Sequence, residues 1–302
     1  MIYIMGRGHS GTTILDLLLG DCPNICGVGE LIPGIERFDS ETCSCSQKVT
    51  NCEFWQGVQK DFDASDFTWS DTTKLTQQAH LFKFPSTLIS STRRLKSLAQ
   101  INWQLTQSIA VQSDCDFVVD SSKEATRGLL LARACDAKVI HLVRSPYEIV
   151  ESNLNRFDAG KPFRLLRRNY HNPKLRYLFI SISALGWTVG LLLSFIVGFF
   201  CKRNFLRIFY RELYSNPSST MTTISKFLDT DMSSVIDKIE SKQPLSVTHR
   251  IAGNRIRFDD CVVFRATRSK RRLNWLETVL VTLFTWPLFV PLRRHLVDPE
   301  TG

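Results

Sequence analysis

Residues 1–20 read MIYIMGRGHSGTTILDLLLG, and this stretch decides the fold class. An apolar, β-prone run at residues 2–5 leads into a glycine-rich turn at residues 6–13, and apolar residues at helical spacing continue from 12 to 19. The turn therefore lies between a strand and the start of a helix, where backbone amides and the helix dipole favour a bound anion. A turn that holds no ligand is the alternative interpretation.

The turn has the frame of a nucleotide triphosphate loop, but Thr12 stands at the position of its lysine. That lysine normally reaches the β- and γ-phosphates of ATP or GTP. Its absence disfavours an ordinary kinase or NTPase and leaves a phosphate or sulfate group of another ligand as the expected anion.

Composition restricts the classes of protein and partner. The chain has 302 residues, of which 43% are hydrophobic, so it can bury a large core. Its formal net charge of +9 suits anionic ligands in general and does not select one of them. The nine cysteines are an odd number, and no secretory signal precedes the glycine turn. We therefore expect a reducing, cytoplasmic location.

Apolar strand-like runs alternate with helical ones along the rest of the chain. The expected elements are strands at 117–120, 138–143 and 205–210 and helices at 122–134 and 216–229. This order predicts an α/β fold, a P-loop-type doubly wound parallel sheet flanked by helices. We assign residues 1–262 to this domain and residues 263–302 to a basic and apolar C-terminal extension.

Polar residues follow three of the expected strands. The first strand leads into the glycine turn, the second into residues 121–123 and the third into Arg144. Each group has a structural explanation of its own, as helix caps or as a surface cation. Because the carboxyl ends of parallel strands meet at one edge of a sheet, their convergence favours a shared anionic ligand.

Five segments together resemble the sulfotransferases that use 3′-phosphoadenosine 5′-phosphosulfate (PAPS), especially the bacterial-type and tyrosylprotein-like branches. They are GRGHSGTTILDLLLG (6–20), VVDSSKEATRG (118–128), HLVRSPYEIVESNLNR (141–156), IFYRELYSNPSSTMTTISKFLD (208–229) and HRIAGNRIRF (249–258). The resemblance covers residues 1 to about 260 and implies transfer of a sulfuryl group from PAPS to an acceptor hydroxyl.

The resemblance also implies a donor site. Its expected residues are Ser10, Gly11, Thr12 and Thr13 around the 5′-phosphosulfate, Arg144 and Ser152 at the 3′-phosphate, Asn254 and Arg257 closing over the nucleotide, and Tyr210 at its border. PAPS has no β/γ-phosphate pair with magnesium, so backbone donors, hydroxyls and fixed cations suffice and no metal is required. Sulfuryl transfer resembles phosphoryl transfer, in which positioning and charge stabilisation dominate.

Two residues depart from the family pattern. His9 stands where relatives usually have a lysine or arginine directly before Ser-Gly-Thr-Thr, and Arg255 stands where the last segment usually has proline. A neutral imidazole gives less charge to the leaving group than a lysine does. We therefore expect Arg7 or Lys123 to supply the missing cation, with His9 as a further catalytic candidate.

The general base must be a carboxylate or a histidine near the acceptor hydroxyl. Glu30 follows Gly29 at the position where tyrosylprotein-like relatives have Gly-Glu, and we predict that it is the base. A solvent-facing glutamate at a helix start is the alternative for this residue. Weaker candidates for the base are Glu36, His141 and His249.

Three cysteines cluster in the sequence at Cys43, Cys45 and Cys52. They could bind zinc together with Cys26 or Cys22, but C-x-C…C lacks the paired spacing of a zinc ribbon or finger. A structural thiol cluster or a disulfide is the favoured interpretation, and we predict no metal site.

Two apolar segments need a separate explanation. Residues 178–201 carry no charge and are long enough to span a bilayer, yet one crossing would divide the expected sheet between two compartments. The segment is therefore either a core helix or an anchor that lies in one leaflet, with peripheral membrane contact. Residues 276–292 follow a basic run that suits an anionic membrane face or a solvated surface. The run consists of Arg265, Arg268, Lys270, Arg271 and Arg272.

The acceptor is open at this stage. A small molecule, a glycan or a lipid fits, and the apolar segments favour a membrane-proximal hydroxyl. Two other function classes remain as alternatives, a P-loop nucleotide-dependent kinase and a non-catalytic membrane-surface binding module. No nucleic-acid-binding motif occurs, so we expect no nucleic-acid partner.

Overall fold

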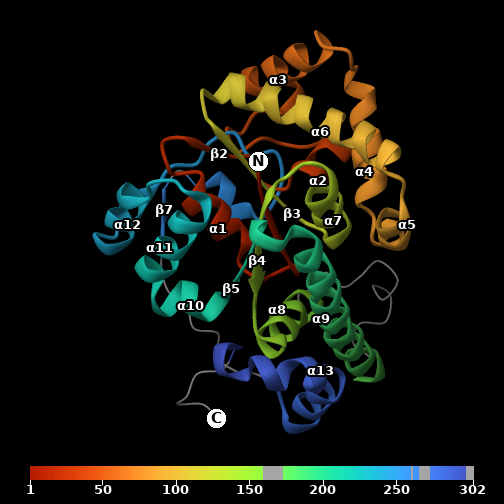
Figure 1. Cartoon of the computed structure of the whole chain (residues 1–302). Helices are drawn as coiled ribbons and strands as arrows, with labels where there is room; N and C mark the ends of the chain where they lie inside the picture. Colours follow the sequence, from red (N-terminus) through yellow and green to blue (C-terminus); the bar gives the residue numbers. More distant parts are fainter. Residues whose placement is uncertain (159–172, 260, 265–272, 297–302) are drawn as a thin grey trace.

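The computed structural model describes residues 1–158, 173–259, 261–264 and 273–296. Its centre is a five-stranded, all-parallel sheet with the strand order β2-β3-β1-β4-β5 (Figure 1). The strands are β1 (Ile2–Gly6), β2 (Ile25–Gly27), β3 (Phe117–Lys123), β4 (Lys138–Val143) and β5 (Phe205–Phe209). The predicted α/β class with a parallel sheet is confirmed.

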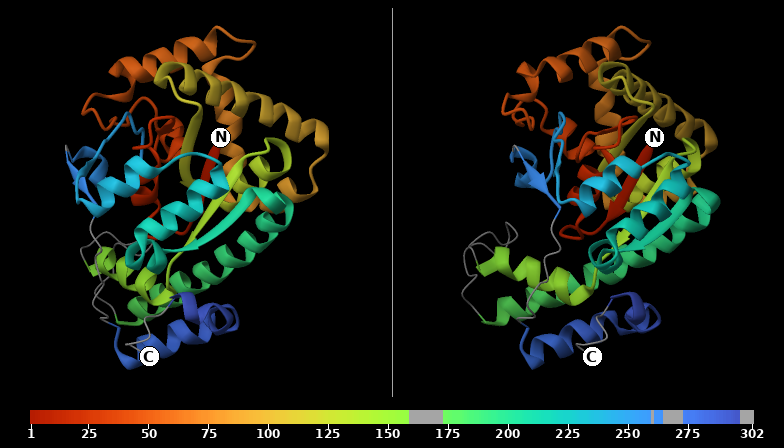
Figure 2. Two further views of the ribbon diagram at one scale, coloured as in Figure 1. Left: turned by 60° about the vertical axis from the view of Figure 1, so that its left-hand side comes forward. Right: turned by 90° about the vertical axis from the view of Figure 1, so that its left-hand side faces the viewer.

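Helices cover both faces and both ends of this sheet (Figures 1 and 2). They are α1 (Thr12–Leu19), α2 (Leu31–Glu36), α3 (Glu53–Asp63), α4 (Thr72–Ala79), α5 (Phe84–Ile89), α6 (Thr92–Ser113), α7 (Ala125–Ala134), α8 (Pro146–Asp158), α9 (Pro173–Cys201), α10 (Tyr210–Ser215), α11 (Pro217–Leu228), α12 (Ser233–Glu240) and α13 (Trp275–Leu296). A small antiparallel pair, β6 (Pro244–Leu245) with β7 (Val262–Val263), stands apart from the main sheet.

The sheet is buried because its strands are apolar on both faces. Residues 2–5 of β1 are at most 2% exposed, as expected for a central parallel strand between two layers of helices. Ile2 and Ile4 face a core that includes α1, α11 and α12, whereas Tyr3 and Met5 face a core with α7 and α9. A further core joins α2, α3, α4 and α6 beyond β2, a helical layer that the sequence patterns do not predict.

Helices α8 and α9 lie in the crossover connection between β4 and β5. The C-terminal end of α9 leads through a 3-10 turn (Lys202–Asn204) into β5, which pairs in register with β4. Helix α9 packs against α7, α8 and α13, and α13 lies at the base of the molecule in both views of Figure 2. Because both ends of α9 connect to the same sheet, a single membrane crossing through it would split one folded unit.

Both long apolar helices keep large exposed surfaces. By length and composition α9 and α13 are apolar enough to cross a membrane, and only 33% and 22% of their most apolar windows are buried. The exposed large apolar side chains of α9 recur every three or four residues along one stripe: Leu178, Ile182, Leu185, Val189, Leu192, Phe195 and Phe199. Helix α9 is thus a core helix on one side and an uncovered apolar surface on the other. The predicted basic run at Arg265–Arg272 lies outside the described residues.

Candidate active site

The loop between β1 and α1 has an unusual backbone. His9 and Gly11 adopt positive φ angles of 69° and 89°. A Cβ on Gly11 would lie 2.6 Å from Cε2 of Tyr210, so both conformation and space require glycine there. The loop thus turns closely under the Tyr210 ring and presents the first amides of α1, which have no acceptor within the helix.

Beside this loop lies a cavity of about 620 Å³, which we call the donor cavity. It is lined by Gly8, His9, Gly11, Thr12, Thr13, Ile14, Glu30, Lys123, Arg144, Ser152, Arg156, Tyr210, Tyr214, Gly253, Asn254, Ile256, Val263 and Phe264. Among these residues three carry a positive charge and only Glu30 carries a negative charge. The cavity is therefore suited to an anionic ligand that also has an aromatic ring to bury.

Arg144 is fixed at the end of β4 by several contacts. Its Nη1 donates to the carbonyl oxygen of His9 at 2.7 Å, and its guanidinium lies 4.1 Å from the centre of the Tyr210 ring. Its Nε also pairs with Glu148 Oε2 at 3.4 Å, and its carbonyl accepts a hydrogen bond from Trp187 Nε1 at 2.9 Å. The cation is held in place beside the glycine loop before any ligand binds.

His9 is surrounded by cations. Burial lowers the pKa of its imidazole from the ordinary value of 6.5, and the neighbouring Arg156, Lys123 and Arg144 lower this pKa further. Nη1 of Arg156 lies 3.5 Å from Nε2 of His9. The imidazole is therefore neutral at pH 7, and the positive charge near the loop comes from its neighbours.

A second cavity of about 540 Å³, the acceptor-side cavity, opens on the other side of the loop. One wall is β4 with the turn after it, and the opposite wall is α9, which contributes Ile182, Leu185, Gly186, Trp187, Val189, Gly190, Leu191 and Leu193. Most of the lining is apolar. The two cavities share four lining residues, Gly8, Glu30, Lys123 and Arg144.

Glu30 stands at this junction on a segment that three buried polar groups hold. Asp16 Oδ2 accepts from the Gly29 amide at 3.2 Å, Asp120 Oδ1 accepts from the Leu31 amide at 3.3 Å, and Ser122 Oγ accepts from the Ile32 amide at 2.9 Å. The two carboxylates are themselves paired in the core, Asp16 with Arg250 at 2.7 Å and Asp120 with Arg127 at 2.6 Å. These ion pairs fix the backbone on either side of Glu30.

The Glu30 side chain forms an ion pair with Lys123. Lys123 ends β3 with a positive φ of 75°, and both side chains are about one fifth exposed. A carboxylate and an ammonium group therefore meet where the two cavities join.

The sequence profile of the Sulfotransferase family matches residues 2–234. The chain belongs to this family. Among solved structures it is similar to the sulfotransferase domain from the curacin biosynthetic pathway, with a TM-score of 0.53, 18% identity, and coverage of 95% of this chain and 96% of that one. It is also similar to the sulfotransferase STF9 from Mycobacterium avium, with a TM-score of 0.51, 13% identity, and coverage of 96% and 76%. No curated protein matches.

The structure brings most of the predicted site residues of this sulfotransferase together. Eight of the nine residues expected at the donor line one of the two cavities. Gly11, Thr12, Thr13, Arg144, Ser152, Tyr210 and Asn254 line the donor cavity, and Ser10 lines the acceptor-side cavity. The catalytic candidates Glu30 and Lys123 line both cavities, and His9 lines the donor cavity.

Two predicted site residues lie elsewhere than expected. Arg257 is buried away from both cavities, because its Nη2 donates to Glu41 Oε1 at 2.8 Å and its Nη1 donates to the Gly253 carbonyl at 2.7 Å. Arg7 lines only the acceptor-side cavity, where its side chain lies over Gly186 and Gly190 of α9. In this sulfotransferase, Lys123 is thus the candidate placed to replace the missing loop cation.

The structure also shows where the three weaker candidates for the general base lie. Glu36 is exposed and lines neither cavity, and His249 lies among cysteines. His141 lines the acceptor-side cavity, but burial, and then the charge of Arg207, lower its pKa to about 3. Its ring stays neutral at every pH near 7.

Sequence reasoning missed Arg156. It follows Ser152 by four residues on α8, so both side chains lie on the same helix face. That spacing within the segment HLVRSPYEIVESNLNR was the available signal, and both residues line the donor cavity.

Proposed function

We propose that this sulfotransferase moves the sulfuryl group of PAPS to the hydroxyl of an apolar, membrane-proximal acceptor. The observation that carries the proposal is the junction of a cationic cavity with an apolar one at Glu30 and Lys123. A nucleotide donor in the first cavity and an alcohol in the second would meet at these two side chains.

The residues of the donor cavity fit PAPS. Ser10 of the adjoining loop lines the acceptor-side cavity, and its buried Oγ has no hydrogen-bond partner among the described residues, so the loop retains a hydroxyl donor for a phosphosulfate oxygen. Lys123, Arg144 and Arg156 supply the charge that two phosphate positions need, and the rings of Tyr210, Tyr214 and Phe264 supply apolar surface for the adenine. A kinase would need carboxylates for magnesium, and Glu30 is the one carboxylate among the described residues that line the donor cavity.

Glu30 and Lys123 have different roles in the transfer, Glu30 as the base and Lys123 as a cation beside the leaving group. The Glu30 carboxylate accepts the proton of the acceptor hydroxyl while that oxygen forms a bond to sulfur. The bond between sulfur and the 5′-phosphate oxygen breaks, and both electrons leave with 3′-phosphoadenosine 5′-phosphate (PAP). Lys123 and the amides of the loop stabilise the charge that develops on the leaving oxygen. The neutral His9 contributes a hydrogen bond rather than a charge.

The acceptor side favours an apolar alcohol. Ile182, Leu185 and Val189 of α9 line this cavity and are nevertheless between 36% and 49% exposed. The cavity wall therefore continues into the exposed apolar stripe of α9. An apolar acceptor that enters from a membrane surface would stay in contact with apolar side chains, and out of water, along this path.

The donor and acceptor assignments are tested by incubating the purified protein with sulfur-labelled PAPS and a lipid extract of its own organism. We expect a labelled product in the organic phase, and its identification would name the acceptor. A parallel reaction with γ-labelled ATP tests the kinase alternative. Label from ATP in a product, with none from PAPS, would overturn the proposal.

Membrane contact predicts a specific behaviour of the α9 stripe. Wild-type protein should float with liposomes, more strongly as anionic lipid increases and less as salt increases, because each cation near the surface contributes about 1 kcal/mol. The exposed residues Leu192 and Phe199 line neither cavity. Replacing both by aspartate should lower binding at least about tenfold, since each apolar side chain withdrawn from lipid costs on the order of 1.5 kcal/mol.

The matched control for this experiment is Val111→Asp, at a side chain that is 69% exposed on α6, a helix that lies apart from α9 in Figure 1. It should bind liposomes like the wild type. A wild-type protein that stays unbound at every lipid composition would remove the membrane part of the proposal and leave the donor assignment standing.

A further inference from the structure

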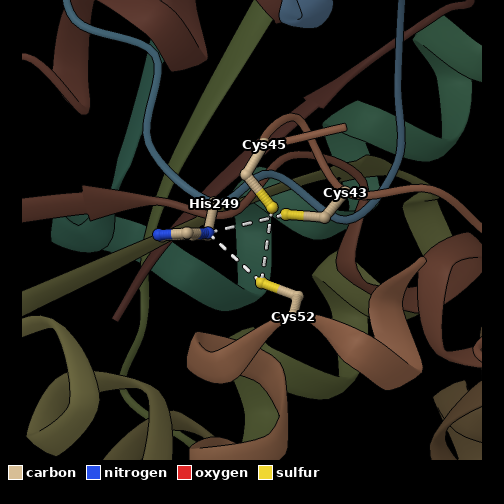
Figure 3. Close-up of side chains that lie close together, drawn as sticks. All are labelled: Cys43, Cys45, Cys52 and His249. Atoms are coloured by element: carbon tan, nitrogen blue, oxygen red, sulfur yellow. Dashed lines mark hydrogen bonds between the residues drawn. The ribbon is translucent and has the colours of Figure 1, made fainter. Parts of the chain in front are cut away.

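Three cysteines and one histidine from distant segments converge at one point (Figure 3). Cys43 and Cys45 lie in the turn after α2, Cys52 directly precedes α3, and His249 lies about 200 residues further along the chain. The three Sγ atoms and a ring nitrogen of His249 all lie within 4.8 Å of one another. All nine cysteines, which fall within the described part of the chain, are free thiols.

Three of the six distances within this cluster are close to the edges of a tetrahedral zinc site. Zinc binds thiolate sulfur at about 2.3 Å and imidazole nitrogen at about 2.0–2.1 Å, so a regular tetrahedral site has S–S edges of about 3.8 Å and S–N edges of about 3.5 Å. The Sγ atoms of Cys45 and Cys52 are 3.6 Å apart. Nδ1 of His249 lies 3.3 Å from Sγ of Cys52 and 3.7 Å from Sγ of Cys43.

We propose that Cys43, Cys45, Cys52 and His249 form a structural zinc site. Three thiolates and one imidazole are the ligand types that zinc prefers, and four protein ligands close the coordination sphere. None of the four residues lines the donor cavity or the acceptor-side cavity, so the metal would hold the fold rather than take part in the transfer. Of the two other cysteines considered from the sequence, Cys22 lies in a different core and Cys26 shares the core of Cys43 and Cys52 without joining the group, and His249 takes the fourth position.

The backbone holds the ligands in this arrangement. Ser44, between the two cysteines, donates its amide to the Arg250 carbonyl at 3.1 Å, and its Oγ accepts from the Arg250 amide at 2.8 Å. The Phe54 ring stacks on the imidazole with centroids 5.0 Å apart and an interplanar angle of 7°, and Figure 3 shows Nδ1 of His249 turned toward the sulfur atoms. A site whose ligands are oriented in advance loses little entropy when the ion binds.

The site would anchor a wall of the active site. His249 is followed by Arg250, whose guanidinium forms the buried ion pair with Asp16, and by Ala252, whose carbonyl accepts from the Glu30 amide at 3.2 Å. The same segment continues into Gly253 and Asn254 of the donor cavity. Zinc would bind this segment to the cysteine turn. It would thereby fix the position of Glu30 relative to the residues of the donor cavity.

Metal content tests this inference directly and independently of the acceptor and donor assignments. The full chain, produced without a histidine tag and purified under reducing conditions, should contain about one zinc ion per chain by elemental mass spectrometry. The exposed ligand Cys45 is the best position for substitution, because Cys45→Ser leaves the core packing intact. Cys45→Ser and His249→Ala should each lower the zinc content at least about fivefold, and the control Cys261→Ser, at an exposed cysteine outside the cluster, should leave it unchanged.

Two further measurements keep the test decisive. Cobalt added to the metal-free wild type should give the visible absorption of tetrahedral cobalt thiolate, and Cys45→Ser should weaken its sulfur-to-metal band. A chelator should lower the melting temperature of the wild type but not that of Cys45→Ser. Folded wild type that contains no zinc and takes up neither zinc nor cobalt under reducing conditions would overturn the inference, as would a disulfide between Cys45 and Cys52 in the active protein.

Discussion

Replacing Glu30 by glutamine should lower the turnover of sulfuryl transfer by on the order of a hundredfold or more. The variant keeps the shape of the side chain and removes the carboxylate that we propose as the proton acceptor at the junction of the two cavities. It also removes the charge that pairs with Lys123, while Asp16, Asp120 and Ser122 still hold the backbone around residue 30. The loss should therefore fall on kcat, with the affinity for PAP changing little.

The matched control for this variant is Glu36→Gln, an exposed glutamate at the last position of α2. It should retain wild-type turnover. Single-turnover rates with bound PAPS and saturating acceptor separate the chemical step from donor binding. Wild-type rates in Glu30→Gln would show that Glu30 is not the general base. The remaining candidates for the base would then be His9 and His141, the two histidines that line the cavities.

Replacing Arg144 by alanine should weaken PAP binding by about 1.5 to 3 kcal/mol, the range for a lost charged hydrogen bond. This corresponds to an affinity about 10- to 150-fold lower. The variant removes a cation of the donor cavity together with its contacts to the His9 carbonyl and the Tyr210 ring, so part of the loss reflects a less ordered loop.

Calorimetric titration with PAP measures this effect. Arg203→Ala, at an exposed arginine outside both cavities, serves as the control for lost net charge and should change PAP affinity little. Arg156→Ala tests the cation that the sequence patterns did not single out, and its affinity loss should be smaller, because the Arg156 side chain is more exposed than that of Arg144. Unchanged affinity in Arg144→Ala would contradict its place at a phosphate of the donor.

The local patterns of the sequence predicted the sheet well. The predicted runs 138–143 and 12–19 correspond to β4 and α1 residue for residue, and 205–210 is one residue longer than β5. Such runs are predictable because a strand buried on both faces must be apolar at every position, and because glycines must stand at the turn that follows. The three-residue strand β2 and the helical layer α3 to α6 carry weaker signals, since short or evenly polar segments fit several structures.

The sequence by itself determined the class of the fold, the loop that presents α1 to an anion, and the set of residues at the strand ends. These features follow from local chemistry, since apolar periodicity, glycine conformations and hydroxyl or cationic side chains act within a few residues of one another. The tertiary structure alone decided the rest. It turned Arg257 toward Glu41, placed Lys123 beside Glu30, and joined His249 to Cys52 across 197 residues. Contacts of that separation depend on the packing of whole layers, which no local pattern encodes.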